Sequence, residues 1–128
     1  MPEPLLSERL IGSTLFLSFR GLDFGVRHIF VAASQRPELI GAVVSRGGRP
    51  ELAGGALRLV RAPTLLIVGG ADEPVIEMNR EALAHLDAPK QLEIISGATH
   101  LFEEPGTLER VAQLAREWFM QHLSRVKA

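Results

Sequence analysis

The chain has 128 residues, of which 46% are hydrophobic and 23% charged, a composition typical of a single globular domain. No apolar run approaches the roughly 20 residues that a membrane span needs, and the acidic N-terminus is unlike a signal peptide, so we expect a cytoplasmic protein that binds no membrane. A net charge of −1 without a basic stripe argues against nucleic acid as a partner, and the absence of cysteine excludes disulfides and thiolate metal sites.

Four short apolar segments rich in β-branched residues are predicted strands. In chain order they are residues 14–19 (TLFLSF), 39–45 (LIGAVVS), 64–70 (TLLIVGG) and 91–96 (QLEIIS). Continuous apolar runs of this length are typical of strands that are buried on both faces of a sheet.

Helical periodicity alternates with these strands. Apolar residues recur at helical spacing in residues 26–33, 75–86 and 108–122, whereas residues 46–62 are too rich in glycine to predict a long helix. Strands and helices that alternate with short connections predict an α/β fold, in which a parallel sheet of about four strands has flanking helices. Because no long linker or repeat divides the chain, we expect one domain over residues 1–128.

Titratable residues follow three of the predicted strands. Asp23 lies in GLDFG after the first strand, Asp72 in GGADEPV after the third, and His100 in SGATHLFEEPG after the fourth. The loops at the carboxyl ends of parallel strands gather at one edge of a sheet, so these side chains are expected to meet. Nucleophile, acid and base occur in this chain order in the α/β-hydrolase triad.

Three segments carry a resemblance to a known family, namely ELIGAVVSRGGRPELAG, APTLLIVGGADEPV and GATHLFEEPG. Residues 21–123 resemble the C-terminal half of a dienelactone hydrolase-like α/β-hydrolase, while residues 1–20 form a divergent N-terminal segment. The resemblance implies a truncated α/β-hydrolase fold in which Asp72 orients His100 as the base. It also places GLDFG in register with the family's G-x-S-x-G nucleophile elbow, with Asp23 in the serine position and the backbone N–H of Phe24 facing the oxyanion.

Each of these assignments has a simpler alternative. Asp72 lies two residues before Pro74, where it would equally suit a helix cap. His100 would suit a hydrogen bond within its own turn, and an aspartate between glycines, such as Asp23, is also an ordinary turn residue.

Other charged and imidazole groups are predicted to be structural or solvated. The RGGR segment (46–49) has the amides and guanidinium groups to bind an anion, but a solvated turn is the favoured interpretation. Glu103 and Glu104 are expected on a solvated face. The remaining histidines fall on helical patterns and are expected at the surface or in packing; they are His28, His85 and His122.

Three functions remain open from the sequence. The first is a hydrolase of a small carboxylic ester or lactone, in which His100 is the base and Asp72 its orienting acid. The second is a non-catalytic half-hydrolase module, because the family's first half and its second oxyanion donor have no counterpart before Gly21. The third makes Asp23 itself the nucleophile on a carbon–halogen bond or an epoxide. Against it, Phe24 replaces the neighbouring tryptophan donor of such enzymes, and the chain has no tyrosine.

Neither a cofactor nor a metal is expected, because no carboxylate–histidine cluster occurs at ligand spacing. A homodimer is expected instead. The strand from Thr14 to Phe19 would be an open apolar edge without the family's earlier strands, and such an edge recruits a partner.

Overall fold

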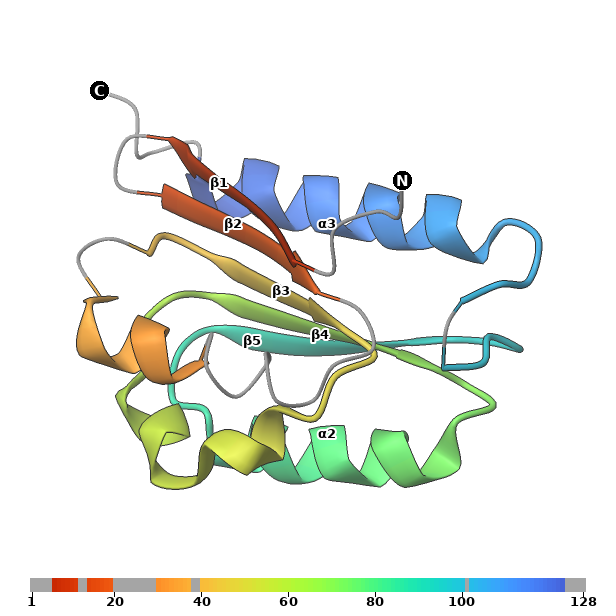
Figure 1. Cartoon of the computed structure of the whole chain (residues 1–128), viewed down its shortest axis with the longest axis horizontal. Helices are drawn as coiled ribbons and strands as arrows, with labels where there is room; N and C mark the ends of the chain where they lie inside the picture. The colour runs from red at the N-terminus through yellow and green to blue at the C-terminus, as the bar shows by residue number, and fades with distance from the viewer. Residues whose placement is uncertain (1–5, 12–13, 20–29, 38–39, 101, 124–128) are drawn as a thin grey trace.

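A computed structural model of the chain describes residues 6–11, 14–19, 30–37, 40–100 and 102–123 (Figure 1). Its centre is a parallel sheet in which β4 (Thr64–Gly69) lies between β3 (Val43–Arg46) and β5 (Lys90–Ile95). Within the described ranges, no helix is both long and apolar enough for a membrane span. The parallel sheet of three strands confirms the predicted α/β class.

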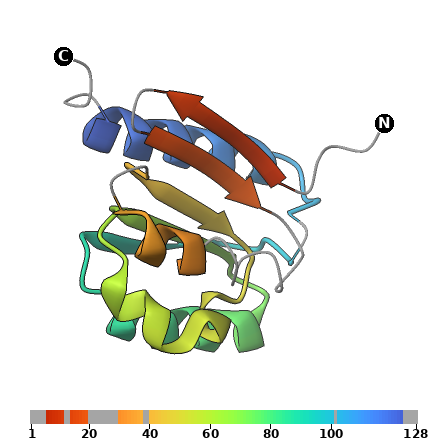
Figure 2. The same cartoon turned by 60° about the vertical axis from the view of Figure 1, so that its left-hand side comes forward.

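Helices cover both faces of this sheet, as Figures 1 and 2 show. α2 (Glu73–His85) and the 3₁₀ helix η2 (Pro50–Leu59) pack on one face together with the helical residues 30–35. α3 (Thr107–Leu123) packs on the other face. Because both faces are covered, the central strand β4 is buried along its whole length, as its continuous apolar run predicts.

The predicted first parallel strand requires a correction. Residues 14–19 do form a strand, β2 (Thr14–Phe19), but its ladder is antiparallel and its partner is β1 (Leu6–Ile11). Only two residues, Gly12 and Ser13, separate the two strands in sequence, and so short a connection favours an antiparallel hairpin. β3 lies alongside β2 on its other side (Figures 1 and 2). The expectation of an open edge at 14–19 is therefore wrong, while the homodimer stays a prediction.

Of the three apolar clusters among the described residues, the two largest lie on opposite faces of the parallel sheet. The first joins Phe30, Leu57 and Leu86 to the inward side chains of β3 and β4, and the second joins Trp118 to the opposite side of the same strands. The indole N–H of Trp118 donates to the carbonyl of Pro63 at 3.2 Å, so its polar atom is paired even though the ring is buried. The helical stripe in α3 is confirmed except at Leu108, which is exposed.

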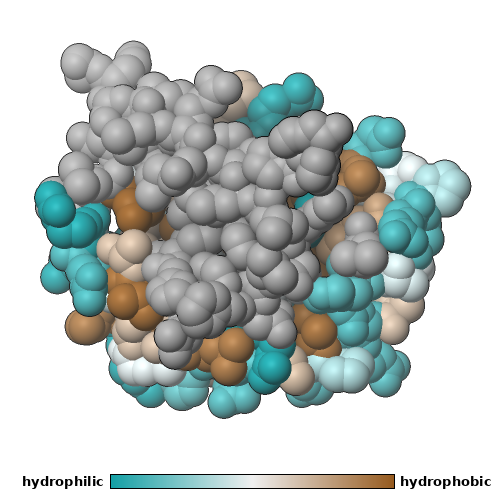
Figure 3. All heavy atoms as spheres, viewed as in Figure 1, coloured by the Kyte–Doolittle hydropathy of each residue, from teal (hydrophilic) through white to brown (hydrophobic). Residues whose placement is uncertain are grey.

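The glycine-rich segment after β3 forms a short, kinked helix. η2 is interrupted at Gly54, whose φ of 57° is in the left-handed region that favours glycine. The kink lets Ala53 and Leu57 both reach the core, while Leu52 and Leu59 remain exposed. Hydrophobic and hydrophilic residues alternate over the lower part of the face in Figure 3, where η2 and α2 lie.

Leu57 and Leu59 offer a matched test of this packing. Leu57 is fully buried and Leu59 is 63% exposed, although both belong to η2. Leu57→Ala is expected to lower the free energy of unfolding by about 2–5 kcal/mol, because it leaves a cavity. Leu59→Ala is expected to change it by no more than about 0.5 kcal/mol. Urea unfolding followed by the fluorescence of Trp118 measures both, and equal losses would contradict the described burial.

Candidate active site

Asp72 lies where β4 passes into α2. Its backbone N–H donates to the carbonyl of Gly69 at 3.0 Å, and its own carbonyl accepts from the amides of Val75 and Ile76 at the start of α2. The backbone of Asp72 thus begins the helix. Asp72 is therefore the N-cap residue of α2 by position, but its side chain makes no capping hydrogen bond among the described residues.

The Asp72 carboxylate instead meets His100, which lies in the loop after β5. Asp72 Oδ2 is 3.0 Å from His100 Nδ1. A carboxylate only accepts hydrogen bonds, so Nδ1 is the donor in this pair. In the neutral ring, the lone pair then lies on Nε2, and this is the arrangement that a general base requires.

The two side chains differ in their exposure to solvent. The Asp72 side chain is 17% exposed, whereas that of His100 is 37% exposed. The carboxylate is therefore largely covered, and the imidazole can still be reached from solution.

Glycines allow the two loops to approach each other. A Cβ atom at Gly69 would lie 2.3 Å from the carbonyl oxygen of Ala98, closer than any side chain tolerates. The backbone of the same connection is bonded to the loop after β5, because the amide of Gly70 donates to Ile95 at 2.7 Å and that of Ala71 donates to Ala98 at 2.9 Å. The Asp72–His100 contact thus depends on two adjacent strand ends that touch backbone to backbone.

The RGGR segment is also part of this region. Gly47 and Gly48 are buried, and Gly47 has a φ of 67°. A Cβ at Gly47 would lie 3.2 Å from the carbonyl oxygen of His100, and the carbonyl of Gly48 accepts from the buried Asn79 at 3.0 Å. The expectation of a solvated turn is therefore wrong, because this segment packs against the backbone of His100.

The other residues singled out from the sequence differ in whether the structure describes them, and His28 is among those that lie outside the described residues. Asp23, Phe24 and the GLDFG turn lie outside the described residues, so the nucleophile elbow stays a prediction. His85 is 3.2 Å from Arg58, and the ring of His122 packs against Trp118 with their centroids 4.1 Å apart. Both histidines are thus surface or packing residues, as expected.

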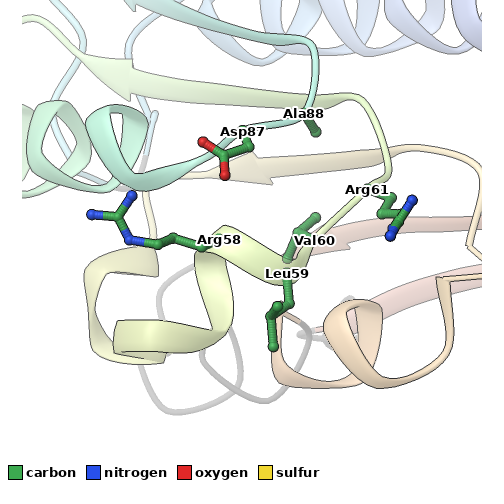
Figure 4. A pocket seen from close by; sticks show the side chains of 6 residues that line it. All are labelled: Arg58, Leu59, Val60, Arg61, Asp87 and Ala88. Atoms are coloured by element: carbon green, nitrogen blue, oxygen red, sulfur yellow. The ribbon is translucent and has the colours of Figure 1, made fainter.

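A shallow pocket of about 400 Å³ lies at the opposite end of the sheet (Figure 4). Arg58, Leu59, Val60 and Arg61 line it just before β4, together with Asp87 and Ala88 just before β5. It is thus at the amino ends of these strands, whereas Asp72 and His100 follow their carboxyl ends, at the right in Figure 1. This pocket does not belong to the Asp72–His100 pair. In the described part of the chain, no group of three acidic, histidine or cysteine side chains is placed to hold a metal ion.

Comparison with known proteins shows which fold this chain shares. No protein-family model matches the chain. The chain is 49% identical over 130 residues to "Putative phosphoribosyl transferase" of Mycobacterium tuberculosis, covering 93% of this chain and 29% of that protein. The solved dienelactone hydrolase from Anabaena variabilis is 59% identical, with a TM-score of 0.77, over 82% of this chain and 49% of its own length. The esterase domain of a Rhodothermus marinus protein shares 17% identity and a TM-score of 0.68, over 82% of this chain and 61% of its own.

The described residues thus form part of an α/β-hydrolase fold. Within that class, the chain corresponds to about half of a dienelactone hydrolase-like protein, which confirms the resemblance that its three motifs indicate. The chain spans about half the length of the dienelactone hydrolase and 29% of the mycobacterial relative.

Gly69 tests whether the strand ends must touch. Gly69→Ala is expected to destabilise the fold by at least about 1–3 kcal/mol, because the new methyl group meets backbone that cannot move aside easily. Gly55→Ala is the control, since a Cβ there meets no atom of the described chain within 4 Å. Urea unfolding compares the two variants. A Gly69→Ala protein as stable as Gly55→Ala would contradict the close approach of the loops.

Proposed function

We propose that this chain carries the acid–base pair of an α/β-hydrolase that cleaves a carboxylic ester or lactone. His100 is the general base and Asp72 the acid that orients it. The observation that supports this proposal best is the 3.0 Å contact between Asp72 Oδ2 and His100 Nδ1 at the carboxyl ends of two parallel strands. The dienelactone hydrolase that is 59% identical supports the substrate class, because a dienelactone is a cyclic ester.

The proposed chemistry needs only proton transfers at His100. As a water oxygen bonds to the ester carbon, His100 Nε2 takes the proton that the water loses. Asp72 stabilises the resulting imidazolium through Nδ1–H. When the tetrahedral intermediate collapses, the bond to the leaving oxygen breaks and Nε2 returns the proton to it. A lactone then opens to a hydroxy acid. A group at the Asp23 position is the other candidate that His100 would activate.

We do not transfer the phosphoribosyl transferase activity to this chain. The matched region is 29% of the mycobacterial protein, so the name of that protein describes a much longer molecule. Over nearly the same region, the more similar solved structure is a hydrolase. A hydrolase is therefore the better-supported proposal.

A second candidate is a half-hydrolase module that assembles with another chain or with its own copy. The observation behind it is that the matched region is 49% of the length of the dienelactone hydrolase. The two candidates differ in one outcome: the module gives no turnover by itself, although its Asp72–His100 pair is intact.

Hydrolysis of p-nitrophenyl acetate by the purified chain tests the proposed pair. His100→Ala is expected to abolish the enzymatic rate. Asp72→Asn is expected to lower it roughly 10²- to 10⁴-fold, because the imidazole loses its orienting acceptor. His85→Ala and Asp87→Asn are matched controls at the opposite end of the sheet, and both should retain the wild-type rate. A rate that His100→Ala leaves unchanged would refute the proposal.

Asp23→Ser tests the predicted elbow. If residue 23 occupies the nucleophile position beside His100, a serine there is expected to increase ester hydrolysis, because the base can then activate a hydroxyl. Asp23→Ala controls for the loss of the carboxylate alone. A serine variant no faster than the alanine variant would contradict the elbow assignment. Halide release from small haloalkanes that is lost in Asp23→Asn would instead support the carboxylate nucleophile.

A further inference from the structure

Thr99, the residue immediately before His100, is held by each of its polar groups. Its amide donates to Glu104 Oε1 at 3.1 Å, and its hydroxyl donates to Glu104 Oε2 at 2.6 Å. Its carbonyl accepts from the amide of Phe102 at 3.1 Å. Both oxygens of the Glu104 carboxylate therefore accept hydrogen bonds from a single residue, which lies next to the proposed base.

Glu104 is itself fixed to the start of α3. The hydroxyl of Thr107, a buried residue, has one proton that is shared between the carbonyl oxygens of Phe102 and Glu104, each of which lies 2.8 Å away. The amide of Thr107 also donates to the Glu104 carbonyl at 3.1 Å. A chain of hydrogen bonds thus runs from the first residue of α3 through Glu104 to the backbone beside His100.

The backbone after His100 is held in an unusual conformation. Phe102 has a φ of 58°, the only non-glycine residue of the described chain with a positive φ, and its side chain is 1% exposed. Such a conformation is unfavourable for a residue with a side chain and persists only where the surroundings determine it. The guanidinium of Arg46 lies over the Phe102 ring, 5.8 Å from its centroid. The loop is therefore constrained on both sides of His100.

The Glu104 carboxyl group is held in its charged form. Hydrogen bonds lower the pKa of the Glu104 carboxyl below its ordinary value. The largest contribution comes from the Thr99 hydroxyl, and smaller ones come from the amides of Thr99 and of Glu104 itself. A lowered pKa means that the interaction stabilises the folded chain above the ordinary pKa of a glutamate and is lost as the pH falls through the lowered value. At neutral pH, Glu104 is thus a carboxylate that accepts both bonds.

We propose that Glu104 is a positioning residue: through Thr99 it fixes the backbone of His100 so that the imidazole stays on the Asp72 carboxylate. The sequence predicts only a solvated Glu104, but its carboxylate is engaged in these two bonds. The catalytic part of this inference rests on the proposed function, whereas the orientation of the ring is measurable without any turnover. Glu103, an exposed glutamate one residue away, is the natural comparison.

Steady-state kinetics on p-nitrophenyl acetate give the first test. Glu104→Ala is expected to lower kcat by roughly 10- to 100-fold with KM nearly unchanged, because a misplaced base slows the chemistry without changing substrate binding. Thr99→Val keeps the shape but loses the hydroxyl, so a smaller fall is expected. Thr99→Ser keeps the hydroxyl and should restore kcat to near the wild-type value. Glu104→Ala with the same kcat as Glu103→Ala would overturn the proposal.

Nitrogen-15 NMR of the labelled histidines gives a test that needs no activity. The His100 signals are those missing from His100→Gln. In the wild type they should report a proton on Nδ1, and in Glu104→Ala a mixture of both tautomers. Unchanged His100 signals in Glu104→Ala would overturn the proposal even if kcat falls. Changed signals in a chain without turnover would support the positioning role and refute the proposed function. If Glu104→Ala does not fold, Thr99→Val and Thr99→Ser decide by the same signals.

Discussion

The contact between the ends of β4 and β5 is the constraint on which the candidate site depends. Gly69 pairs with Ile95 in register, and its missing side chain lets the backbone of Ala98 approach. Asp72 follows Gly69 by three residues and His100 follows Ala98 by two, so neither side chain has to reach far. Parallel strands place both loops at one end of the sheet. The 3.0 Å contact is thus a consequence of strand register and of one glycine.

The sequence predicts the buried elements well, because burial leaves a pattern in one dimension. Residues 64–70 and 91–96 match β4 and β5 to within one residue at each end, and the stripe over 75–86 matches α2. The same pattern does not say which neighbour a strand pairs with. The apolar pattern of residues 14–19 fits a parallel strand and an antiparallel strand equally well. The pairing of these residues depends on a two-residue connection and on β1, a strand that the sequence pattern does not predict.

The candidate site also contains residues that the sequence predicts and residues that it does not predict. Asp72 and His100 are predictable because motif and chain order identify them together. Thr99 and Glu104 were missed because their bonds depend on a loop backbone that turns through the positive φ of Phe102, and no periodic pattern reports such a turn. A signal was nevertheless present: a hydroxyl and a carboxylate five residues apart, in a short loop between Gly97 and Pro105, have few other partners within reach.

The exposure of the two side chains fits the proposed catalytic role of the pair better than a purely structural role. A structural histidine bonded to a carboxylate gains most when both groups are covered, because the bond is strongest away from water. Here the carboxylate is 17% exposed and the imidazole 37%, so only the acceptor is shielded. A base needs this asymmetry, since its far nitrogen must meet substrate while its near nitrogen stays fixed. In the proposed arrangement the Glu104 carboxylate accepts from Thr99 and not from the ring, so it holds the backbone of His100 while Asp72 accepts from Nδ1.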